Sequence, residues 1–134
     1  MPITHIVPVL RVTDVARSIQ WYKNMLGFDG DPFPDKPPYA FAILRHGDSE
    51  LMIRNEPPIA RPTPKKYQWD VHLKLEDMPF RDLFAKLQKA GVVTRRMEKM
   101  FYGLAEFEIT DPDGYVLCLS QKLEDDSDLP SPEF

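Results

Sequence analysis

A single thiol is the most reactive side chain in this sequence. Cys118 stands between Leu117 and Leu119 in a stretch typical of a β-strand. To act as a nucleophile it would need a neighbouring base, for which His5 and His72 are the candidates. A cysteine between apolar residues in a strand is more often buried and inert, so its position favours a structural thiol.

Two pairs of carboxylates are candidates for general acid–base chemistry. Glu106 and Glu108 alternate along one predicted strand, and Glu50 and Asp70 lie in strands of the two halves of the chain. Exposure to solvent is the more common outcome for strand carboxylates, and a catalytic pair would need perturbed pKa values. The sequence contains no glycine-rich phosphate loop, serine-nucleophile elbow or histidine-rich zinc spacing. We therefore expect no catalytic residue.

The acidic charge is concentrated at the C-terminal end. Five of the 21 Asp and Glu residues lie in residues 124–134, so residues 1–123 carry 16 acidic against 17 basic residues. We expect residues 124–134 to be an acidic, flexible tail and residues 1–123 to be a single, nearly neutral domain. The basic residues form no stripe, which argues against nucleic-acid binding.

Composition predicts a globular cytoplasmic protein. The hydrophobic fraction of 43% is ordinary, and no apolar run approaches the roughly 20 residues that a membrane span needs. The one cysteine permits no internal disulfide, which fits a reducing compartment. The N-terminal residues run directly into the first predicted strand, without the basic region and apolar stretch of an export signal. We expect no contact with a membrane.

The first half of the sequence predicts a strand, a helix and two more strands. Residues 3–12 alternate as a strand does, and residues 15–26 repeat apolar side chains at helical spacing. Asp14 can cap this helix, and Gly27 can end it. Residues 39–44 and 50–54 are predicted strands, whereas the proline-rich residues 31–38 are predicted to be irregular.

The second half repeats this order after a proline-rich linker, residues 55–68. A strand is predicted over residues 69–75, a helix from Pro79 to Gly91, and strands near residues 92–94, 102–109 and 116–120. The last two strands flank Asp111-Pro112-Asp113-Gly114, whose residue types are typical of a tight turn.

The two halves are an internal duplication. Asp14 and Asp77 follow similar strand-like segments and lie 63 residues apart, and Gly27 and Gly91 lie 64 apart. The duplication predicts an α+β fold of two tandem βαβββ modules, at about residues 3–55 and 68–122.

The sequence resembles the vicinal-oxygen-chelate superfamily, which includes glyoxalase I, extradiol dioxygenases and bleomycin-resistance proteins. The resemblance covers residues 3–121 and rests on Leu10–Val15, Trp21-Tyr22, Leu26–Phe28, Leu87–Gly91 and Asp111–Gly114. It implies two βαβββ modules whose mixed sheets curve around a cleft. It also implies a homodimer, in which modules often pair across subunits.

The resemblance further implies where a metal ion would be held. Metal-dependent members use His, Glu or Gln from the first and last strands of each module, and the strand phase puts these positions at Val7, Met52, Asp70 and Cys118. Val7 and Met52 offer no ligand to a hard or borderline cation. We therefore expect no bound metal and no cofactor, with carbon and sulfur at the pocket floor.

A displaced metal site is the alternative. His5 and His72 lie two residues from Val7 and Asp70, on the same predicted faces, so His5, Asp70 and His72 would supply three ligands. The favoured interpretation is that His5 frays at the strand start and that His72 hydrogen-bonds a neighbour or a ligand.

Without metal ligands, the chain resembles the bleomycin-resistance branch, whose members sequester a drug in an aromatic-lined groove. Trp69 is the best candidate for a ligand contact, because it opens a strand whose apolar face begins only at Val71; each aromatic residue also fits a place in the core. The predicted ligand-binding residues are Trp69, Tyr102, Val7, Met52, Phe41, Asp70, His72 and Arg54.

Three functions follow from these predictions. The first is metal-independent binding and sequestration of a small amphipathic or aromatic compound by a homodimer, as in antibiotic resistance. The second is a divalent-metal-dependent, glyoxalase-like lyase, isomerase or dioxygenase with a displaced metal site. The third is a structural or regulatory module whose cleft is filled by its own side chains.

Overall fold

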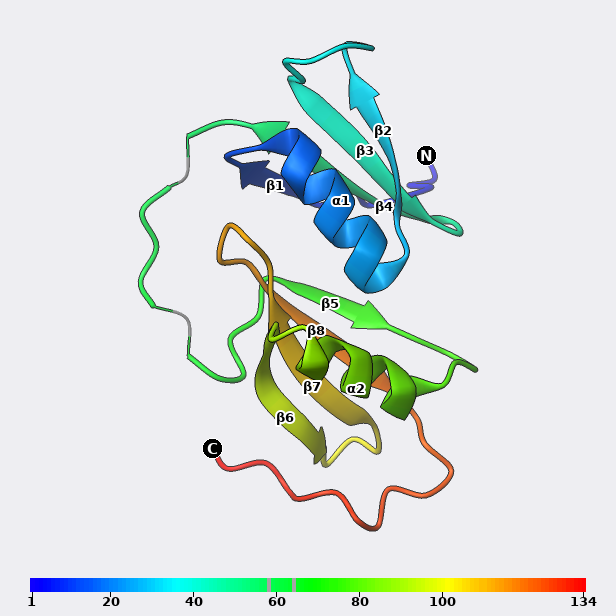
Figure 1. Ribbon diagram of the computed structural model, residues 1–134. Coiled ribbons are helices and arrows are strands. Elements are labelled where there is room, and N and C mark those ends of the chain that lie inside the picture. Colours follow the sequence, from blue (N-terminus) through cyan, green and yellow to red (C-terminus); the bar gives the residue numbers. More distant parts are fainter. Residues whose placement is uncertain (58, 64) are drawn as a thin grey trace. The chain divides into compact units, whose positions relative to one another are not determined.

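Each half of the chain folds into a four-stranded sheet with one helix packed against it (Figure 1). The computed structural model describes residues 1–57, 59–63 and 65–134. These form two units, Met1–Arg61 and Pro62–Phe134. The α+β fold of two βαβββ modules that the duplication predicts is confirmed.

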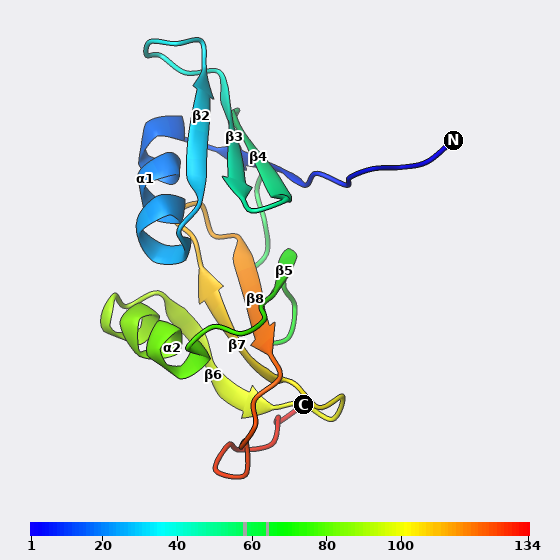
Figure 2. The same ribbon diagram turned by 90° about the vertical axis from the view of Figure 1, so that its right-hand side faces the viewer.

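The first module contains β1 (Val9–Val12), α1 (Val15–Leu26), β2 (Asp29–Phe33), β3 (Phe41–His46) and β4 (Ser49–Asn55). The strand order is β1-β4-β3-β2, with β1 parallel to β4 and the other pairs antiparallel. The helix lies against one face of this sheet (Figure 2). Between the two layers, Val15 and Tyr22 of the helix are buried together with alternate strand residues: Leu10, Val12, Ala42, Leu44, Leu51 and Ile53.

The helix α1 begins and ends where the sequence predicts. The Asp14 side chain accepts a hydrogen bond from the Arg17 backbone N–H at 3.0 Å, which satisfies one of the unpaired donors of the first turn. Gly27 has a φ of 75°, a left-handed conformation that a residue without Cβ adopts at little cost, and its N–H bonds the Lys23 carbonyl.

Two strand predictions in this module need correction. The predicted strand at residues 3–12 is confined to Val9–Val12, and the preceding residues have no regular structure; Pro8 has no N–H with which to continue the ladder. The stretch at residues 31–38 is not wholly irregular, because β2 includes Asp31–Phe33. This strand lies at the edge of the sheet, where a proline such as Pro32 is tolerated.

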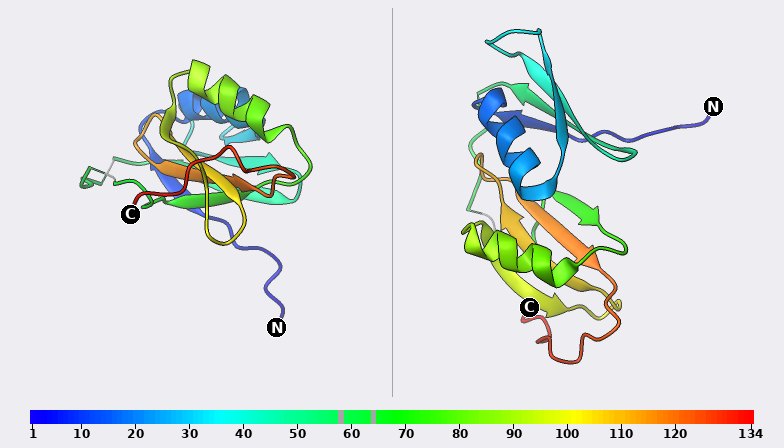
Figure 3. Two further views of the ribbon diagram at one scale, coloured as in Figure 1. Left: turned by 90° about the horizontal axis from the view of Figure 1, so that it is seen from below. Right: turned by 45° about the vertical axis from the view of Figure 1, so that its right-hand side comes forward.

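The second module contains β5 (Val71–Lys74), α2 (Phe80–Lys89), β6 (Val93–Lys99), β7 (Ala105–Thr110) and β8 (Val116–Gln121). The strand order is β5-β8-β7-β6, the same as in the first module. Figure 3 shows α2 against one face of this sheet. There the Phe80 and Phe84 rings pack on the Phe107 ring, and their centroids lie 5.1 and 4.9 Å, respectively, from the Phe107 centroid.

The strand β6 is longer than predicted. It runs over seven residues, Val93–Lys99, and its pairing with β7 shifts register between Val93 and Arg95 and again between Arg95 and Glu98. These irregularities break the strict alternation of faces, so the sequence predicted only a short strand near residues 92–94. They also allow Arg95 and Glu98 to reach the same side of the sheet.

The turn between β7 and β8 is confirmed. The Asp111 carboxylate accepts hydrogen bonds from the N–H groups of Asp113 and Tyr115, both at 2.9 Å. Gly114 has a φ of 88° and donates its N–H to the Asp111 carbonyl.

The acidic residues after β8 make specific contacts with the second module. Arg81 holds the Asp128 carboxylate through two hydrogen bonds of 2.9 and 2.8 Å. The Pro130 carbonyl accepts a 2.9 Å hydrogen bond from the Lys99 N–H at the edge of the sheet. The flexibility of this segment in solution stays a prediction. Neither helix in the described part of the chain has the length and apolar character needed to cross a bilayer.

Candidate ligand-binding site

The helix covers one face of each sheet, and we call the other the open face. On the open face of the first sheet, Val9, Met52 and Ile43 lie side by side on three neighbouring strands. The stacked rings of Phe33 and Phe41 extend this surface, with centroids 4.9 Å apart. Because Val9 is 51% exposed and Phe33 38% exposed, this face offers apolar surface to a ligand.

Charged side chains surround this apolar surface in pairs. Glu56 forms ion pairs with Arg11 at 2.8 Å and with Arg54 at 2.9 Å. Arg45 forms an ion pair with Asp31 at 3.0 Å. All three arginine side chains are substantially exposed, so each pair contributes little to stability. Arg54, a predicted ligand contact, is therefore held by a carboxylate in this structure.

The open face of the second sheet carries a buried group of charges, the Arg95 cluster: Arg95, Glu98, Glu106 and Glu108. The Arg95 guanidinium lies 2.8 Å from Glu98, 2.6 Å from Glu106 and 2.5 Å from Glu108. All four residues are at most 2% exposed. The expectation that Glu106 and Glu108 are exposed is thus wrong, because one guanidinium with five donors can satisfy carboxylates on two strands at once.

Burial and hydrogen bonding act in opposite directions on these charges. Burial disfavours the charged guanidinium, but its bonds to Glu98 and Glu106 and the charge of Glu108 outweigh this and raise the pKa of Arg95. Burial likewise disfavours the Glu98 carboxylate, yet bonds from Arg95 and Tyr67 lower its pKa. The cluster therefore holds three carboxylates around one guanidinium.

Three aromatic side chains adjoin this face. The Tyr67 ring lies 4.4 Å from the Arg95 guanidinium carbon, and its hydroxyl donates to Glu98 at 2.9 Å. The Tyr102 hydroxyl donates to Glu106, and burial, reinforced by that carboxylate, raises the pKa of Tyr102. The Trp69 and His72 rings lie 5.5 Å apart. Tyr102 is still 43% exposed.

A histidine and a thiol lie beside Glu106. His72 of β5 is the register partner of Cys118 of β8, and one of its ring nitrogens lies 2.8 Å from the Ser120 hydroxyl. One possible metal-ligand atom from each of His72, Glu106 and Cys118, namely a ring nitrogen, a carboxylate oxygen and the sulfur, lies within 4.8 Å of the other two. Burial lowers the pKa of His72 and raises that of Cys118. Burial therefore favours the protonated, less nucleophilic form of the thiol.

The structure divides the predicted ligand-binding residues between the two modules. Trp69, Tyr102 and His72 come together on the open face of the second sheet. Met52, Phe41 and Arg54 belong to the first sheet, where Phe41 and Arg54 are register partners, and Val7 lies before β1, half-buried. Binding by these residues stays a prediction.

The three residues proposed for the displaced metal site lie in two units, His5 in the first and Asp70 and His72 in the second, so their convergence stays a prediction. The Asp70 carboxylate accepts a 2.9 Å hydrogen bond from the Val116 N–H and is exposed. His5 is exposed and outside any regular element of the first unit. His72 lies with Glu106 and Cys118.

Arg95, Glu98 and Tyr67 are site residues that the sequence did not reveal, and the sequence also did not predict the burial of Glu106 and Glu108. Glu106 and Glu108 alternate with the buried apolar Phe107 and Ile109, a pattern that equally describes a solvent-exposed strand face. The consecutive residues Arg95 and Arg96 lie in β6, next to the strand that carries these glutamates. They were the signal in the sequence that the carboxylates have a buried partner.

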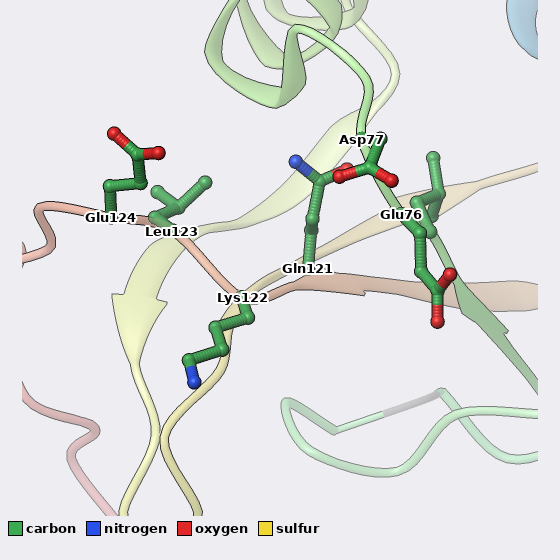
Figure 4. A pocket seen from close by; sticks show the side chains of 7 residues that line it. Glu76, Asp77, Gln121, Lys122, Leu123 and Glu124 are labelled. Carbon is green, nitrogen blue, oxygen red and sulfur yellow. The ribbon is translucent and has the colours of Figure 1, made fainter.

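A hollow between the end of β5 and the residues after β8 has acidic walls (Figure 4). Its lining residues are Leu75, Glu76, Asp77, Gln121, Lys122, Leu123 and Glu124. Gln121 donates its amide to the Met78 carbonyl at 2.8 Å. The Glu76 and Glu124 carboxylates point away from the Gln121 side chain, and in the described part of the chain the acidic residues of this hollow form no group of three converging ligand atoms.

The two sheets have the same strand order, and each is covered by a helix on one face. Aromatic and polar side chains line the open face of each sheet. This arrangement defines a protein of the duplicated βαβββ class. The family model described as Glyoxalase/Bleomycin resistance protein/Dioxygenase superfamily matches residues 3–119. The chain belongs to this superfamily, as its motifs indicate.

Solved structures share the fold at low sequence identity. TioX from Micromonospora sp. ML1 is 19% identical, with a TM-score of 0.69 over 90% of this chain and 99% of that chain. Virulence protein STM3117 from Salmonella typhimurium is 25% identical, with a TM-score of 0.61 over 92% and 100%. A glyoxalase/bleomycin resistance protein/dioxygenase from Alicyclobacillus acidocaldarius is 15% identical, with a TM-score of 0.69 over 89% and 91%. Comparison with curated protein sequences gives no match.

Proposed function

We propose that this protein binds and sequesters a small amphipathic or aromatic compound without a metal ion. The observation that carries the proposal is the placement of two aromatic residues around a polar pair. Trp69 packs beside His72, Tyr102 bonds Glu106, and donor atoms of His72 and Glu106 lie within 4.8 Å of each other. Aromatic walls beside a few fixed polar groups are typical of small-molecule sites.

The first module supports the same function with different chemistry. Its open face presents Val9, Met52, Ile43 and the Phe33–Phe41 stack, so it offers apolar contact area where the second module offers charge and hydrogen bonds. At the positions where metal-dependent members carry ligands, Val7 and Met52 have no donor for a hard or borderline cation. The residues present do not fit the family's metal site.

A ligand screen tests the binding function. Thermal unfolding of the purified protein should be followed with cationic and aromatic antibiotics, and a compound that prefers the folded state should raise the midpoint. Elemental analysis of protein purified without added metal or chelator should show well under one ion per chain. A flat response to all compounds, together with a stoichiometric metal, would reject this function.

We also propose that the protein is a homodimer, as the superfamily resemblance implies. Light scattering on the protein as it elutes from a size-exclusion column measures its mass directly. A mass of twice 15.6 kDa is expected, and a mass of 15.6 kDa at micromolar concentration would reject the dimer.

The second candidate is a divalent-metal-dependent lyase, isomerase or dioxygenase, favoured by the group His72, Glu106 and Cys118. Imidazole, carboxylate and thiolate suit zinc or cobalt, and such an ion would supply Lewis-acid activation. The Ser120 contact of His72 is the kind of outer partner that orients a ligating imidazole. Against it, both oxygens of Glu106 are already bound, by Arg95 and by Tyr102.

Cobalt titration separates the two candidates. A thiolate-to-cobalt charge-transfer band that is present in the wild type and absent in Cys118→Ser would establish metal binding at this group. No band at stoichiometric cobalt is expected if the protein is a metal-independent binder.

A further inference from the structure

We propose that residues 125–134 form a strap that holds Tyr67 over the Arg95 cluster, and that the cluster becomes accessible to a ligand when this strap opens. The identification of the covered surface as a ligand face rests on the proposed function. The existence of the strap and its opening do not, because they can be measured without any ligand.

Tyr67 closes the cluster through three separate contacts. Its ring lies over the Arg95 guanidinium at 4.4 Å. Its hydroxyl donates to Glu98 at 2.9 Å, and its backbone N–H donates to Glu108 at 3.0 Å. One residue thus touches three of the four charged members, and the Arg95 side chain beneath it is 1% exposed.

The end of the strap holds Tyr67 in place. The Glu133 N–H donates to the Tyr67 hydroxyl at 3.0 Å, and the Phe134 ring lies 4.8 Å from the Tyr67 ring. Arg96 adds a longer contact with Glu133 at 3.7 Å. Phe134 is itself 85% exposed, so this end of the strap has little buried surface to keep it closed.

The middle of the strap is anchored more firmly. Arg81 of α2 binds both oxygens of Asp128 and also the Asp125 carbonyl at 2.9 Å. The Pro130 carbonyl extends the edge of the sheet by accepting the Lys99 N–H. Beneath this part of the strap, Leu129 and Pro130 line a hollow whose other apolar residues are Phe84 and Met97. The end of the strap can therefore leave Tyr67 while its middle stays bound.

The backbone of Tyr67 favours opening. Its φ is 68°, a left-handed conformation that is uncommon for a residue with a bulky side chain and is kept only where the surroundings enforce it. The contacts with Arg95, Glu98 and Glu108 in front and with Glu133 and Phe134 behind supply this constraint. When the strap leaves, the residue gains access to ordinary backbone conformations.

Hydrogen exchange at the Tyr67 amide tests the strap directly, because this N–H donates to Glu108 in the closed state and would lose that partner on opening. Three variants are compared with the wild type: deletion of residues 125–134, Arg81→Ala and Phe134→Ala. Each should accelerate exchange at Tyr67, by about tenfold for Phe134→Ala, as expected for a local opening that has lost one stabilising contact. Arg45→Ala is the matched control, since its side chain is 44% exposed against 46% for Arg81 and also pairs with carboxylates.

Arginine modification supplies the second readout. Phenylglyoxal should leave Arg95 unmodified in the wild type and in Arg45→Ala, and should modify it in the deletion and in Phe134→Ala. Unchanged exchange at Tyr67 in all three strap variants would overturn the proposal. An equal acceleration at Ala105–Thr110 would also overturn it, because residues 125–134 would then stabilise the whole module rather than hold Tyr67.

Discussion

Arg95 Nη2 lies 2.6 Å from Glu106 Oε2, between side chains that are 1% and 0% exposed. Two further carboxylates share the same guanidinium, so the cation is the common partner of the whole cluster. Removing it would leave three buried carboxylates facing one another without a cationic partner.

Replacing Arg95 by methionine should therefore destabilise the protein by about 3–5 kcal/mol, since it leaves several buried charges uncompensated. Urea unfolding followed by circular dichroism measures this loss. The exposed Arg45, which pairs with Asp31 and Glu50, is the control, and Arg45→Ala should cost at most about 1 kcal/mol. Equal losses in the two variants would contradict the assignment of Arg95 as the organising charge.

Gly30 in β2 leaves no space for a side chain. A Cβ at this position would lie 2.6 Å from Ile19 Cγ2 and 3.3 Å from Leu44 Cδ2, so a side chain here would force the Ile19 side chain to shift. Gly30→Ala should lower the free energy of unfolding by about 1–3 kcal/mol through overpacking.

A double-mutant cycle with Ile19→Ala checks this cause. Removing the Ile19 side chain makes room for the new methyl group, so the cost of Gly30→Ala should be smaller in the Ile19→Ala background. Additive losses would show that the cost has a source other than the contact between these two residues.

Stability should fall as the pH is lowered through the ordinary pKa of histidine, because burial lowers the pKa of His72 below 6.5 in the folded state. Between the two pKa values the unfolded chain binds more protons, so this contribution to stability is complete above 6.5 and is lost as the pH falls toward the folded pKa. Unfolding free energies between about pH 7.5 and pH 5.5 measure the slope.

His72→Gln should flatten this slope, whereas His5→Gln should retain it because His72 is still present. The chosen range stays above the ordinary pKa of 4.5 of Glu98, whose lowered value adds a separate loss of stability only at more acidic pH. A slope that survives in His72→Gln would assign the effect to another group.

Trp69→Ala should weaken binding of a compound identified by the thermal screen by about 1–3 kcal/mol, in the range of a lost stacking contact. Titration calorimetry of the wild type and the variant measures the difference. Ile59→Ala removes an apolar side chain that is 63% exposed and lies outside any helix or strand of the first unit, and it should leave affinity within about 0.5 kcal/mol of the wild type. Unchanged affinity in Trp69→Ala would remove this residue from the site.

Local signals were sufficient for the elements that carry their own stop and start residues. Asp14 caps the start of α1 and Gly27 caps its end, as predicted, and Asp111 and Gly114 form the last turn. Sequence is sufficient here because caps and turns are decided within a few residues of chain. The second strand of each module was harder. Pro32 in β2 and the register shifts of β6 break the alternation by which a strand is recognised.

Sequence alone determined the duplication and the two βαβββ modules, since these follow from repeated local patterns at a spacing of about 63 residues. The superfamily was indicated by the resemblance of its motifs. The resemblance also predicts that Val7 and Met52 stand where metal-dependent members carry ligands, and this stays a prediction. Only the tertiary structure decided that Arg95, Glu98, Glu106 and Glu108 share one buried site, and that Tyr67 and Phe134 lie over it. Charged residues are exposed by default, and their burial depends on partners that other strands supply, which no local pattern records.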